Sequence, residues 1–389
     1  VTITENESAP TVTLAVSATS IVENAGSSLT LTATLSGATD ETVTVALGTS
    51  GSATEGTDYT DGSGNVDDIT ISAGSTTGTV NFTPTDDSVY ENDETATIAI
   101  TGVSGGGASE SGSQSVTITI SENESAPTVA LTVSASSIAE NAGSSLTLTA
   151  TLSVAADEAV TVSLSTSGTS TEGTDYTDGS GNVDDITISA GSTTGTVNFT
   201  PTDDSVYEGN ETAIIAISSV SGADASESGS QSVTITITEN ESAPTITLTR
   251  SAASIDENSA STVTLTATIS GVTDSAVTVA LDTSGTATEG TDYGTISDIT
   301  ISAGATTGTA TLDPTDDNIY EDDETATIDI GSVSGKSGVT ENGTQQVSVT
   351  IAENESAPTV TLATSATSIA ENAGTSLTLT ATLSVATTA

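Results

Sequence analysis

Positive charge is almost absent from the chain. Of its 389 residues only Arg250 and Lys336 are basic, none is histidine, and 53 are Asp or Glu, which gives a formal net charge of −51. Nucleic acids and anionic membrane surfaces attract proteins through basic patches. The sequence therefore excludes nucleic acid as a partner. It also has no apolar run long enough to cross a bilayer, so we expect no direct membrane insertion.

Cysteine is missing too, and the aromatic residues are only six Tyr and two Phe. Without cysteine there are no disulfides and no thiolate metal sites. Without His or Cys the common pairs of nucleophile and base cannot form. Paired carboxylates can hydrolyse glycosides, but a sugar cleft usually needs aromatic platforms, which are scarce here. We therefore predict that the chain is not an enzyme.

The chain is built from long repeats. The string ENESAPT begins at Glu5, Glu122, Glu239 and Glu353, and a period this long corresponds to a whole domain. We predict the last strand of a preceding repeat at 1–7, complete repeats at 8–124, 125–241 and 242–355, and the first strands of an incomplete repeat at 356–389. We expect the chain to be a window of a longer protein, so missing targeting signals indicate nothing about its compartment.

Apolar and hydroxyl residues alternate within each repeat. In the first complete repeat they do so over 29–36, 42–49, 68–72, 78–83, 95–100 and 115–120, after an opening strand over 11–17 that continues over 19–26. A period of two predicts half-buried strands, separated by Gly-, Ser- and Asp-rich breaks. Val, Ile, Leu and Phe make up only about a fifth of the chain, which borders on the composition of disordered acidic chains. The patterning favours an all-β fold of tandem seven-stranded antiparallel β-sandwiches, immunoglobulin-like and strung like beads on a rod.

Acidic residues gather at one end of each predicted sandwich. Because successive strands run in opposite directions, the first, third and fifth connections and the end of the last strand meet at one pole. In the first repeat that pole holds Glu23, Glu55, Asp58, Asp61, Asp86, Asp87, Glu91, Glu94, Glu122 and Glu124, whereas the other pole holds only Asp40, Glu41 and Glu110. Like charges this close destabilise a fold unless a cation neutralises them. Many oxygen ligands on flexible loops suit Ca²⁺, with two or more ions per repeat, better than Mg²⁺. The alternative is a solvated acidic face.

The stretch GTDYT at 56–60, followed by ISAGSTTGTVNFTPTDDSVYENDET at 71–95, resembles the Calx-β domain. This calcium-binding sandwich occurs in sodium–calcium exchangers and in tandem in large bacterial surface proteins. The resemblance covers the three complete repeats and both fragments. It implies a sandwich fold and calcium ligands at matching positions. The family's terminal acidic run is often Asp-rich, whereas this chain has ENE.

The resemblance implies the same ligand set in each repeat. The Glu after the first strand is Glu23, Glu140 or Glu257, and the Asp of the Asp-Tyr turn is Asp58, Asp175 or Asp292. The paired aspartates are Asp86 and Asp87, Asp203 and Asp204, and Asp316 and Asp317. The glutamates that follow are Glu91 and Glu94, Glu208 and Glu211, and Glu321 and Glu324. The terminal run supplies Glu122 and Glu124, Glu239 and Glu241, and Glu353 and Glu355.

Two further motifs are weaker. The stretch DGSGNVDD at 61–68 is similar to an EF-hand loop but lacks the Gly at the sixth position and the Glu at the twelfth, so we do not count it as a site. The NES tripeptides at Asn6, Asn123, Asn240 and Asn354 fit glycosylation sequons and are candidate points of glycan attachment.

These observations predict a non-catalytic structural protein. We expect a calcium-rigidified stalk or filament, located outside the cell or on its surface, in which each repeat contacts its neighbours. Homo-association into a fibre is a further expected contact. Two alternatives stay open: the extender of a calcium-dependent adhesin that binds a surface or receptor, and a calcium sensor.

Overall fold

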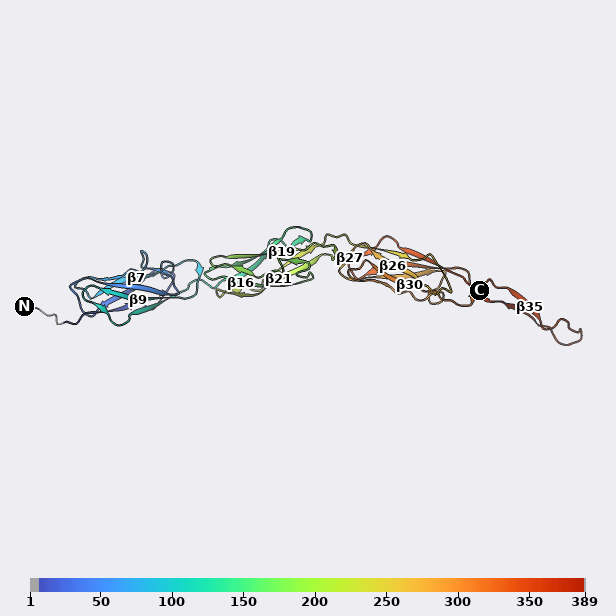
Figure 1. Cartoon of the computed structure of the whole chain (residues 1–389), viewed down its shortest axis with the longest axis horizontal. Coiled ribbons are helices and arrows are strands. Elements are labelled where there is room, and N and C mark those ends of the chain that lie inside the picture. The colour runs from blue at the N-terminus through green and yellow to red at the C-terminus, as the bar shows by residue number, and fades with distance from the viewer. Residues whose placement is uncertain (1–6, 388–389) are drawn as a thin grey trace, which may run out of the picture. The chain divides into compact units, whose positions relative to one another are not determined.

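The computed structural model describes residues 7–387, and every regular element in that range is a strand (Figure 1). None of the described segments is a helix long and apolar enough to span a membrane. The strand predicted over 1–7 lies outside the described residues except for Glu7.

The first repeat forms two sheets of five strands each. Their orders are β10-β1-β3-β7-β5 and β2-β11-β9-β4-β6. The strands are β1 (Thr11–Val16), β2 (Ser20–Val22), β3 (Leu29–Leu35), β4 (Val43–Gly51), β5 (Tyr59–Thr60), β6 (Ile69–Ile71), β7 (Thr77–Pro84), β8 (Val89–Tyr90), β9 (Glu94–Ser104), β10 (Ser109–Glu110) and β11 (Ser115–Ser121). All seven predicted strands are present, and the opening strand crosses between the sheets, as β1 in one and β2 in the other. The predicted fold class, tandem β-sandwiches, is confirmed.

Alternation along the strands builds the core. In β3 every second residue, from Leu29 to Leu35, is buried while the threonines between them are partly or fully exposed. The inward side chains of both sheets meet in one apolar cluster. Tyr59 and Phe82 stack within it, with ring centroids 4.5 Å apart. Tyr59, part of the Asp-Tyr turn, therefore packs in the core and anchors the neighbouring Asp58 at the acidic pole.

The sheets end at the acidic pole with a turn that only glycine fits. Gly51, the last residue of β4, has φ +131°, and a Cβ there would lie 1.9 Å from the carbonyl oxygen of Thr95. Because side chains other than hydrogen would clash with β9, the loop that carries Asp58 leaves the sheet at a fixed point.

The middle repeat has the same order of strands, with β15 as an addition. Its strands are β12 (Thr128–Val133), β13 (Ser137–Ala139), β14 (Leu146–Leu152), β15 (Ala155–Ala156), β16 (Val160–Gly168), β17 (Tyr176–Thr177), β18 (Ile186–Ile188), β19 (Thr194–Pro201), β20 (Val206–Tyr207), β21 (Glu211–Ser221), β22 (Ser226–Glu227) and β23 (Ser232–Thr238).

The third repeat follows with β24 (Thr245–Arg250), β25 (Ser254–Asp256), β26 (Val263–Ile269), β27 (Val272–Thr273), β28 (Val277–Gly285), β29 (Ile299–Ile301), β30 (Thr307–Leu312), β31 (Ile319–Tyr320), β32 (Glu324–Ser334), β33 (Thr340–Glu341) and β34 (Gln346–Ala352). Its shorter loop after β28 replaces the counterpart of β5 with a single bridge between Tyr293 and Pro314. The incomplete repeat contributes β35 (Val360–Thr364), β36 (Leu379–Leu383) and β37 (Ala386–Thr387). Its residues are almost all exposed.

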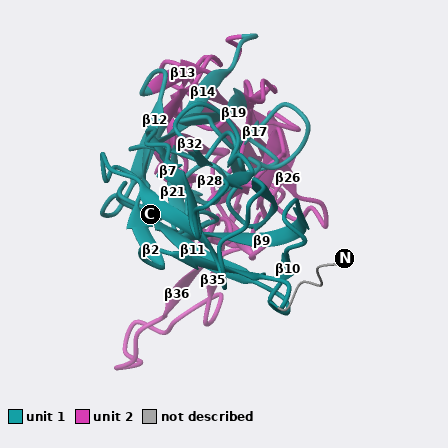
Figure 2. Cartoon of the chain, turned by 90° about the vertical axis from the view of Figure 1, so that its left-hand side faces the viewer, with its two compact units in different colours: residues 1–136, 143–200, 213–235 teal, residues 137–142, 201–212, 236–389 magenta. Residues whose placement is uncertain are grey.

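Two compact units make up the chain (Figure 2). One comprises residues 1–136, 143–200 and 213–235, and the other residues 137–142, 201–212 and 236–389. The boundary runs through the middle repeat, so residues 137–142 and 201–212 of its acidic end belong to the same unit as the third repeat, whereas Asp175 belongs to the other unit.

Candidate metal centre

Three carboxylates form an inner cluster at the acidic pole of the first repeat. Asp58, Glu91 and Glu94 each place one oxygen within 4.8 Å of the others. Asp58 is held in its turn because its Oδ2 accepts a hydrogen bond from the Thr54 N–H at 2.5 Å. Glu91 follows β8, and Glu94 opens β9. The cluster thus joins two loops that are distant in sequence.

An outer cluster lies at the end of the last strand. Glu23, Glu122 and Glu124 also bring one oxygen each within 4.8 Å of one another. Glu122 Oε1 accepts hydrogen bonds from the backbone N–H groups of Asn123 and Glu124, both at 2.6 Å. Its Oε2 accepts one from the N–H of Glu91. Glu122 therefore contacts the inner cluster as well and ties the two together.

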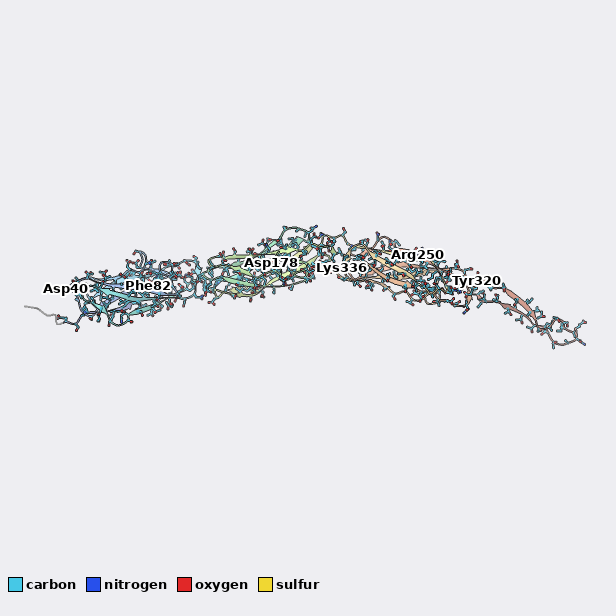
Figure 3. All side chains as sticks on the ribbon, in the orientation of Figure 1. Asp40, Phe82, Asp178, Arg250, Tyr320 and Lys336 are labelled. Carbon is cyan, nitrogen blue, oxygen red and sulfur yellow. The ribbon has the colours of Figure 1, made fainter. Side chains whose placement is uncertain are left out.

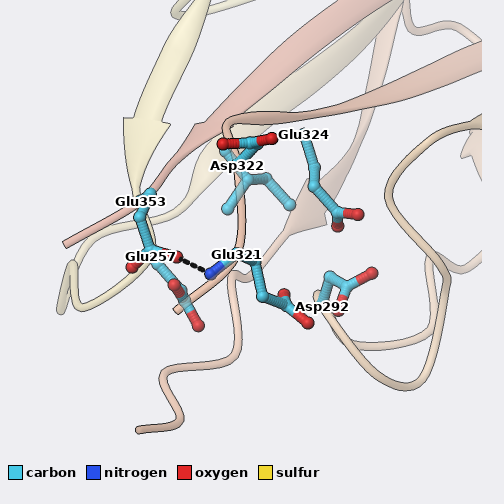
Figure 4. Close-up of a pocket in the computed structure, with 7 residues that line it drawn as sticks. Glu257, Asp292, Glu321, Asp322, Glu324 and Glu353 are labelled. Carbon is cyan, nitrogen blue, oxygen red and sulfur yellow. Dashed lines mark hydrogen bonds between the residues drawn. The ribbon is translucent and has the colours of Figure 1, made fainter. Parts of the chain in front are cut away.

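The third repeat repeats this arrangement around a small cavity. Glu257, Glu353 and Glu355 form its outer cluster. A cavity of about 10 Å³ is lined by Glu257, Asp292, Glu321, Asp322, Glu324, Ile351 and Glu353. In Figure 4 the carboxyl groups of Glu321 and Glu324 lie toward Asp292, and the Glu321 N–H donates to Glu353. That volume is about the room needed for one water molecule or ion.

The middle repeat has an outer cluster of Glu140, Glu239 and Glu241. Glu239 Oε2 accepts hydrogen bonds from the N–H groups of Glu208 and Gly209, both at 2.6 Å, as Glu122 does from Glu91 in the first repeat. Asp175, Glu208 and Glu211 are the counterparts of the inner cluster by position in the repeat.

The second aspartate of each pair has a structural task. Asp87 Oδ1 accepts the Val89 N–H at 2.7 Å, and the Asp87 N–H donates to Glu23 Oε1 at 3.1 Å. Asp204 and Asp317 bond Val206 and Ile319 in the same way. One oxygen of each therefore shapes the loop. The first aspartates, Asp86, Asp203 and Asp316, lie near the terminal glutamates. Hydrogen bonds with Glu122, Glu239 and Glu353 are the main cause that raises the pKa of Glu124, Glu241 and Glu355, and the charges of the first aspartates add to it.

The electrostatics of the clusters favour a bound cation. Burial, followed by the charges of Glu122, Asp87 and Glu124, raises the pKa of Glu23 to about 7 against the lowering effect of the bond from Asp87. Burial and Asp58 raise the pKa of Glu94 to about 8. Burial also acts on Glu122, but hydrogen bonds from backbone N–H groups lower its pKa. The protein alone therefore leaves several carboxylates poorly stabilised as anions.

In the part of the chain that the structure describes, neither of the two basic side chains forms an ion pair with a carboxylate of the clusters. Arg250 donates to the carbonyl oxygen of Ala253 at 3.2 Å, and Lys336 pairs with Asp274 at 2.7 Å (Figure 3). Within the described residues, Oε2 of Glu94, Glu124 and Glu324 is buried without a hydrogen-bond donor. The clusters offer only oxygen ligands, with no nitrogen or sulfur, and this chemistry fits a hard divalent cation. The number of carboxylates fits Ca²⁺.

Two acids at the pole outside the predicted ligand set are satisfied locally. Glu55 accepts hydrogen bonds from Thr49 and Val66. Asp61 Oδ1 accepts three, from the Ser63 N–H, the Ser63 hydroxyl and the Gly64 N–H, and these bonds lower its pKa. The loop that is similar to an EF-hand is therefore a closed turn whose Asp61 is already satisfied.

Comparison with protein families identifies the repeats. The Calx-beta domain matches residues 5–124, 122–241 and 239–355. The chain belongs to the Calx-beta family. Calx-beta repeats are binding or structural domains rather than an enzyme family, and they bind calcium in homologues.

Solved structures of Calx domains and of a bacterial protein are similar to this chain or to parts of it. CBD12 from CALX1.2 is 16% identical over 57% of this chain and 99% of that chain, with a TM-score of 0.26. The apo form of the Calx CBD1 domain is 21% identical over 28% of this chain and 99% of that chain, with a TM-score of 0.24. Invasin, a bacterial integrin-binding protein, is 16% identical over 90% of this chain and 61% of that chain, with a TM-score of 0.29. No curated protein sequence matches the chain.

Each Calx-beta repeat also contacts the next through its acidic loop. In the first repeat β8 pairs in parallel with β15 of the second, and the Asp157 N–H donates to the Tyr90 carbonyl at 3.1 Å. The Tyr90 hydroxyl donates to Asp224 Oδ2 at 3.3 Å. Asp157 belongs to the pole opposite the acidic end of its own repeat, yet it lies close enough to Glu122 for that charge to contribute to raising its pKa, after burial and Glu158.

The joint between the second and third repeats has the same two-residue parallel pairing as the first joint, but different side chains contact each other. Strand β20 pairs in parallel with β27 of the third repeat. Lys336 Nζ donates to the Glu208 carbonyl and pairs with Asp274, the third repeat's counterpart of Asp157. Sequence reasoning expected neighbouring repeats to contact each other but named none of the residues that pair at the two joints. The signal for them was the Val-Tyr or Ile-Tyr pair that recurs inside each acidic loop.

Glu122 tests whether the clusters bind metal, because it contacts both of them. We expect Glu122→Gln to remove the calcium-binding capacity of one repeat, about a third of the total, because the outer cluster loses a ligand charge and the Glu91 backbone of the inner cluster loses its charged acceptor. Calorimetric titration of the whole chain measures the number of sites. Asp40→Asn, an exposed residue at the opposite pole, is the matched control. Equal losses in the two variants would mean that the acids act only as diffuse surface charge.

Proposed function

We propose that the chain is a calcium-rigidified stalk, built from tandem Calx-beta repeats and located outside the cell or on its surface. The observation that carries this proposal is that the acidic loop and the joint are one segment. Tyr90, which contacts the second repeat, lies between Asp87, which bonds Glu23, and Glu91, which belongs to the inner cluster. A cation that orders this loop also orders the contact with the next repeat.

The mechanism depends on the repulsion between carboxylates that destabilises the loop when no cation is bound. Carboxylates within 4.8 Å of one another repel, so the loop that carries Tyr90 opens readily and loosens the short parallel ladder to β15. Calcium neutralises this charge and links the loop to Glu23 and Glu122. The joint then has one preferred geometry in place of a set of hinge positions.

The proposed location follows from calcium availability. Extracellular calcium is millimolar and fills even the weaker oxygen-ligand sites, whereas resting cytosolic calcium fills only dedicated high-affinity ones. The NES tripeptides at Asn123, Asn240 and Asn354 fit this location as places for glycans. The repeats serve as spacers and carry no reaction. The extender of a calcium-dependent adhesin is the second candidate, and a calcium sensor the third.

Small-angle scattering on the whole chain tests the stalk. In millimolar calcium we expect a long, narrow distribution of interatomic distances, and in chelator a broader distribution with a shorter mean, because freed joints let the repeats swing. Magnesium is the control for non-specific screening. The stalk is rejected if both forms have the same distribution or if the calcium form is the more compact one. The latter outcome supports a sensor.

A further inference from the structure

The two joints between complete repeats share a backbone pairing but differ in charge. Eight matching positions lie at or beside each joint: four follow the tyrosine of the acidic loop, two follow the receiving strand, and two belong to the loop after the long strand. In the first joint they are Glu91, Asn92, Asp93, Glu94, Asp157, Glu158, Ala223 and Asp224, and in the second they are Glu208, Gly209, Asn210, Glu211, Asp274, Ser275, Lys336 and Ser337. Six acids give the first set a formal charge of −6, whereas three acids and one lysine give the second set −2. Every change of charge between the two joints makes the second joint less negative.

Lys336 joins the two sides of the second joint. Its Nζ forms an ion pair with Asp274 Oδ1 at 2.7 Å and also donates to the carbonyl of Glu208, which belongs to the acidic loop of the second repeat. The lysine side chain is only 12% exposed. An ammonium group can donate three hydrogen bonds and carries a full positive charge. It therefore does at this joint what a bound metal ion does, since it neutralises acidic groups and links oxygen atoms of two repeats.

The first joint has no counterpart of this ammonium group. Ala223 stands at the position of the lysine, and no ion pair is present at this joint within residues 7–387. Glu158 and Asp224 instead carry negative charge beside a hollow of about 460 Å³, which Asn92 of the first repeat also lines. Asp224 accepts the hydrogen bond of the Tyr90 hydroxyl and, after burial, contributes most to raising its pKa. Acids of the two repeats thus repel each other across this joint.

We propose that Lys336 is a built-in cation of the second joint, so that this joint stays closed without calcium while the first joint opens. The inference rests on the proposed function, in which calcium closes a joint, and goes further by giving the two joints different requirements. In chelator the first repeat then swings relative to the second, whereas the third repeat stays attached to its neighbour. One chain thus combines a joint that responds to calcium with one that does not.

Distances between spin labels test each joint separately. Because the chain has no cysteine, an introduced pair of cysteines carries the only labels. Thr70, Thr187 and Thr300 are exposed residues in the middle of matching edge strands, β6, β18 and β29. Labels at 70 and 187 report on the first joint, and labels at 187 and 300 report on the second. In chelator we expect a broad distribution of distances for the first pair and a narrow one for the second, and in millimolar calcium both should be narrow.

Lys336→Met removes the ammonium group and keeps the apolar stem of the side chain. It leaves Asp274 beside the acidic loop without its ion pair. In chelator we expect the distribution for the second joint to become as broad as that for the first. Arg250→Met is the matched control, because it removes the same charge from the chain, but the guanidinium of Arg250 donates within its own repeat, to the carbonyl of Ala253. This control should leave both distributions unchanged.

A double variant acts in the opposite direction at the first joint. Glu158→Gln with Asp224→Asn removes two charges and keeps oxygens that can accept from the Ala223 N–H and the Tyr90 hydroxyl. Asparagine also suits the left-handed backbone at Asp224, where φ is 49°. In chelator we expect this variant to narrow the distribution for the first joint.

Two results overturn the inference: a second joint as broad as the first in chelator, or a Lys336→Met chain whose second joint stays narrow. Failure of the proposed function looks different. Calcium would then leave the first joint as broad as it is in chelator, while the second joint would still be narrow and would still depend on Lys336. That result supports the assignment of Lys336 and rejects the calcium-rigidified stalk.

Discussion

Removal of calcium is expected to lower the melting temperature of the chain by roughly 15–30 °C. Each repeat places an inner and an outer cluster at one pole, and two bound ions per repeat are a minimal estimate. An ion present at about 100 times its dissociation constant stabilises the folded state by about 2.7 kcal/mol. For a domain of this size, about 1 kcal/mol corresponds to roughly 3–6 °C. Two ions therefore give a shift of the stated order in each repeat.

Calorimetric melts of the whole chain in excess chelator and in millimolar calcium measure this shift. Magnesium at the same concentration is the control, because Mg²⁺ keeps its waters and fits a cage of carboxylates poorly. If magnesium raises the melting temperature as much as calcium does, the clusters do not select Ca²⁺ over Mg²⁺. Equal melting temperatures in chelator and in calcium would contradict the assignment of a metal centre.

Much of this site could be predicted from the sequence, for a simple geometric reason. Alternating strands that reverse direction bring every second connection to the same pole, so Asp58 and Glu94 had to lie near each other whatever their loop conformations. The division into two clusters was not predictable in the same way. It depends on which backbone N–H groups reach which oxygens, as at Glu122, whose two oxygens accept from residues on opposite sides.

The paired aspartates show a further limit. The resemblance implies that both are ligands, and that assignment stays a prediction. The structure adds that Asp87, Asp204 and Asp317 each use one oxygen to close a turn. Sequence alone cannot separate a ligand from a loop-shaping residue when one side chain has two oxygens that can do both.

The joints lay beyond sequence reasoning for another reason. They pair only two residues with two, which is too short for the alternation that marks a strand, and nothing in the recurring Val-Tyr or Ile-Tyr pair says what it contacts. Lys336 occurs in one repeat only, and its pairing with Asp274 follows from the position of the neighbouring repeat. Asp157, the counterpart of Asp40 in the middle repeat, lies at the pole opposite the acidic end of its own repeat. Its closeness to Glu122 became visible only when one repeat was seen beside the next.

In chelator, the melting temperature of the chain is expected to be highest near pH 5 and to fall as the pH rises to 8. Burial raises the pKa of Glu94 to about 8 and that of Glu324 to about 7. In the unfolded state both carboxyls have the ordinary pKa of 4.5, so between these values the folded state holds protons that the unfolded state has released. Their stabilising contribution is complete below pH 4.5 and is lost as the pH passes through 7 to 8. In calcium the trend reverses over the same window, because protons compete with the ion for the same oxygens.

The double variant Glu94→Gln with Glu324→Gln separates these two effects, because glutamine is neutral at every pH. In chelator at pH 8 we expect the variant to melt higher than the parent, since two repelling charges are gone from buried positions. At pH 5 in chelator the difference should shrink, because the parent carboxyls are then protonated. In millimolar calcium at pH 8 the sign reverses and the variant melts lower, since the acidic loops of the first and third repeats have each lost a ligand charge. Asp40→Asn, at the opposite pole, should leave all three melts unchanged. A variant that melts lower than the parent under all three conditions would show that these glutamates stabilise the fold by themselves, without a metal.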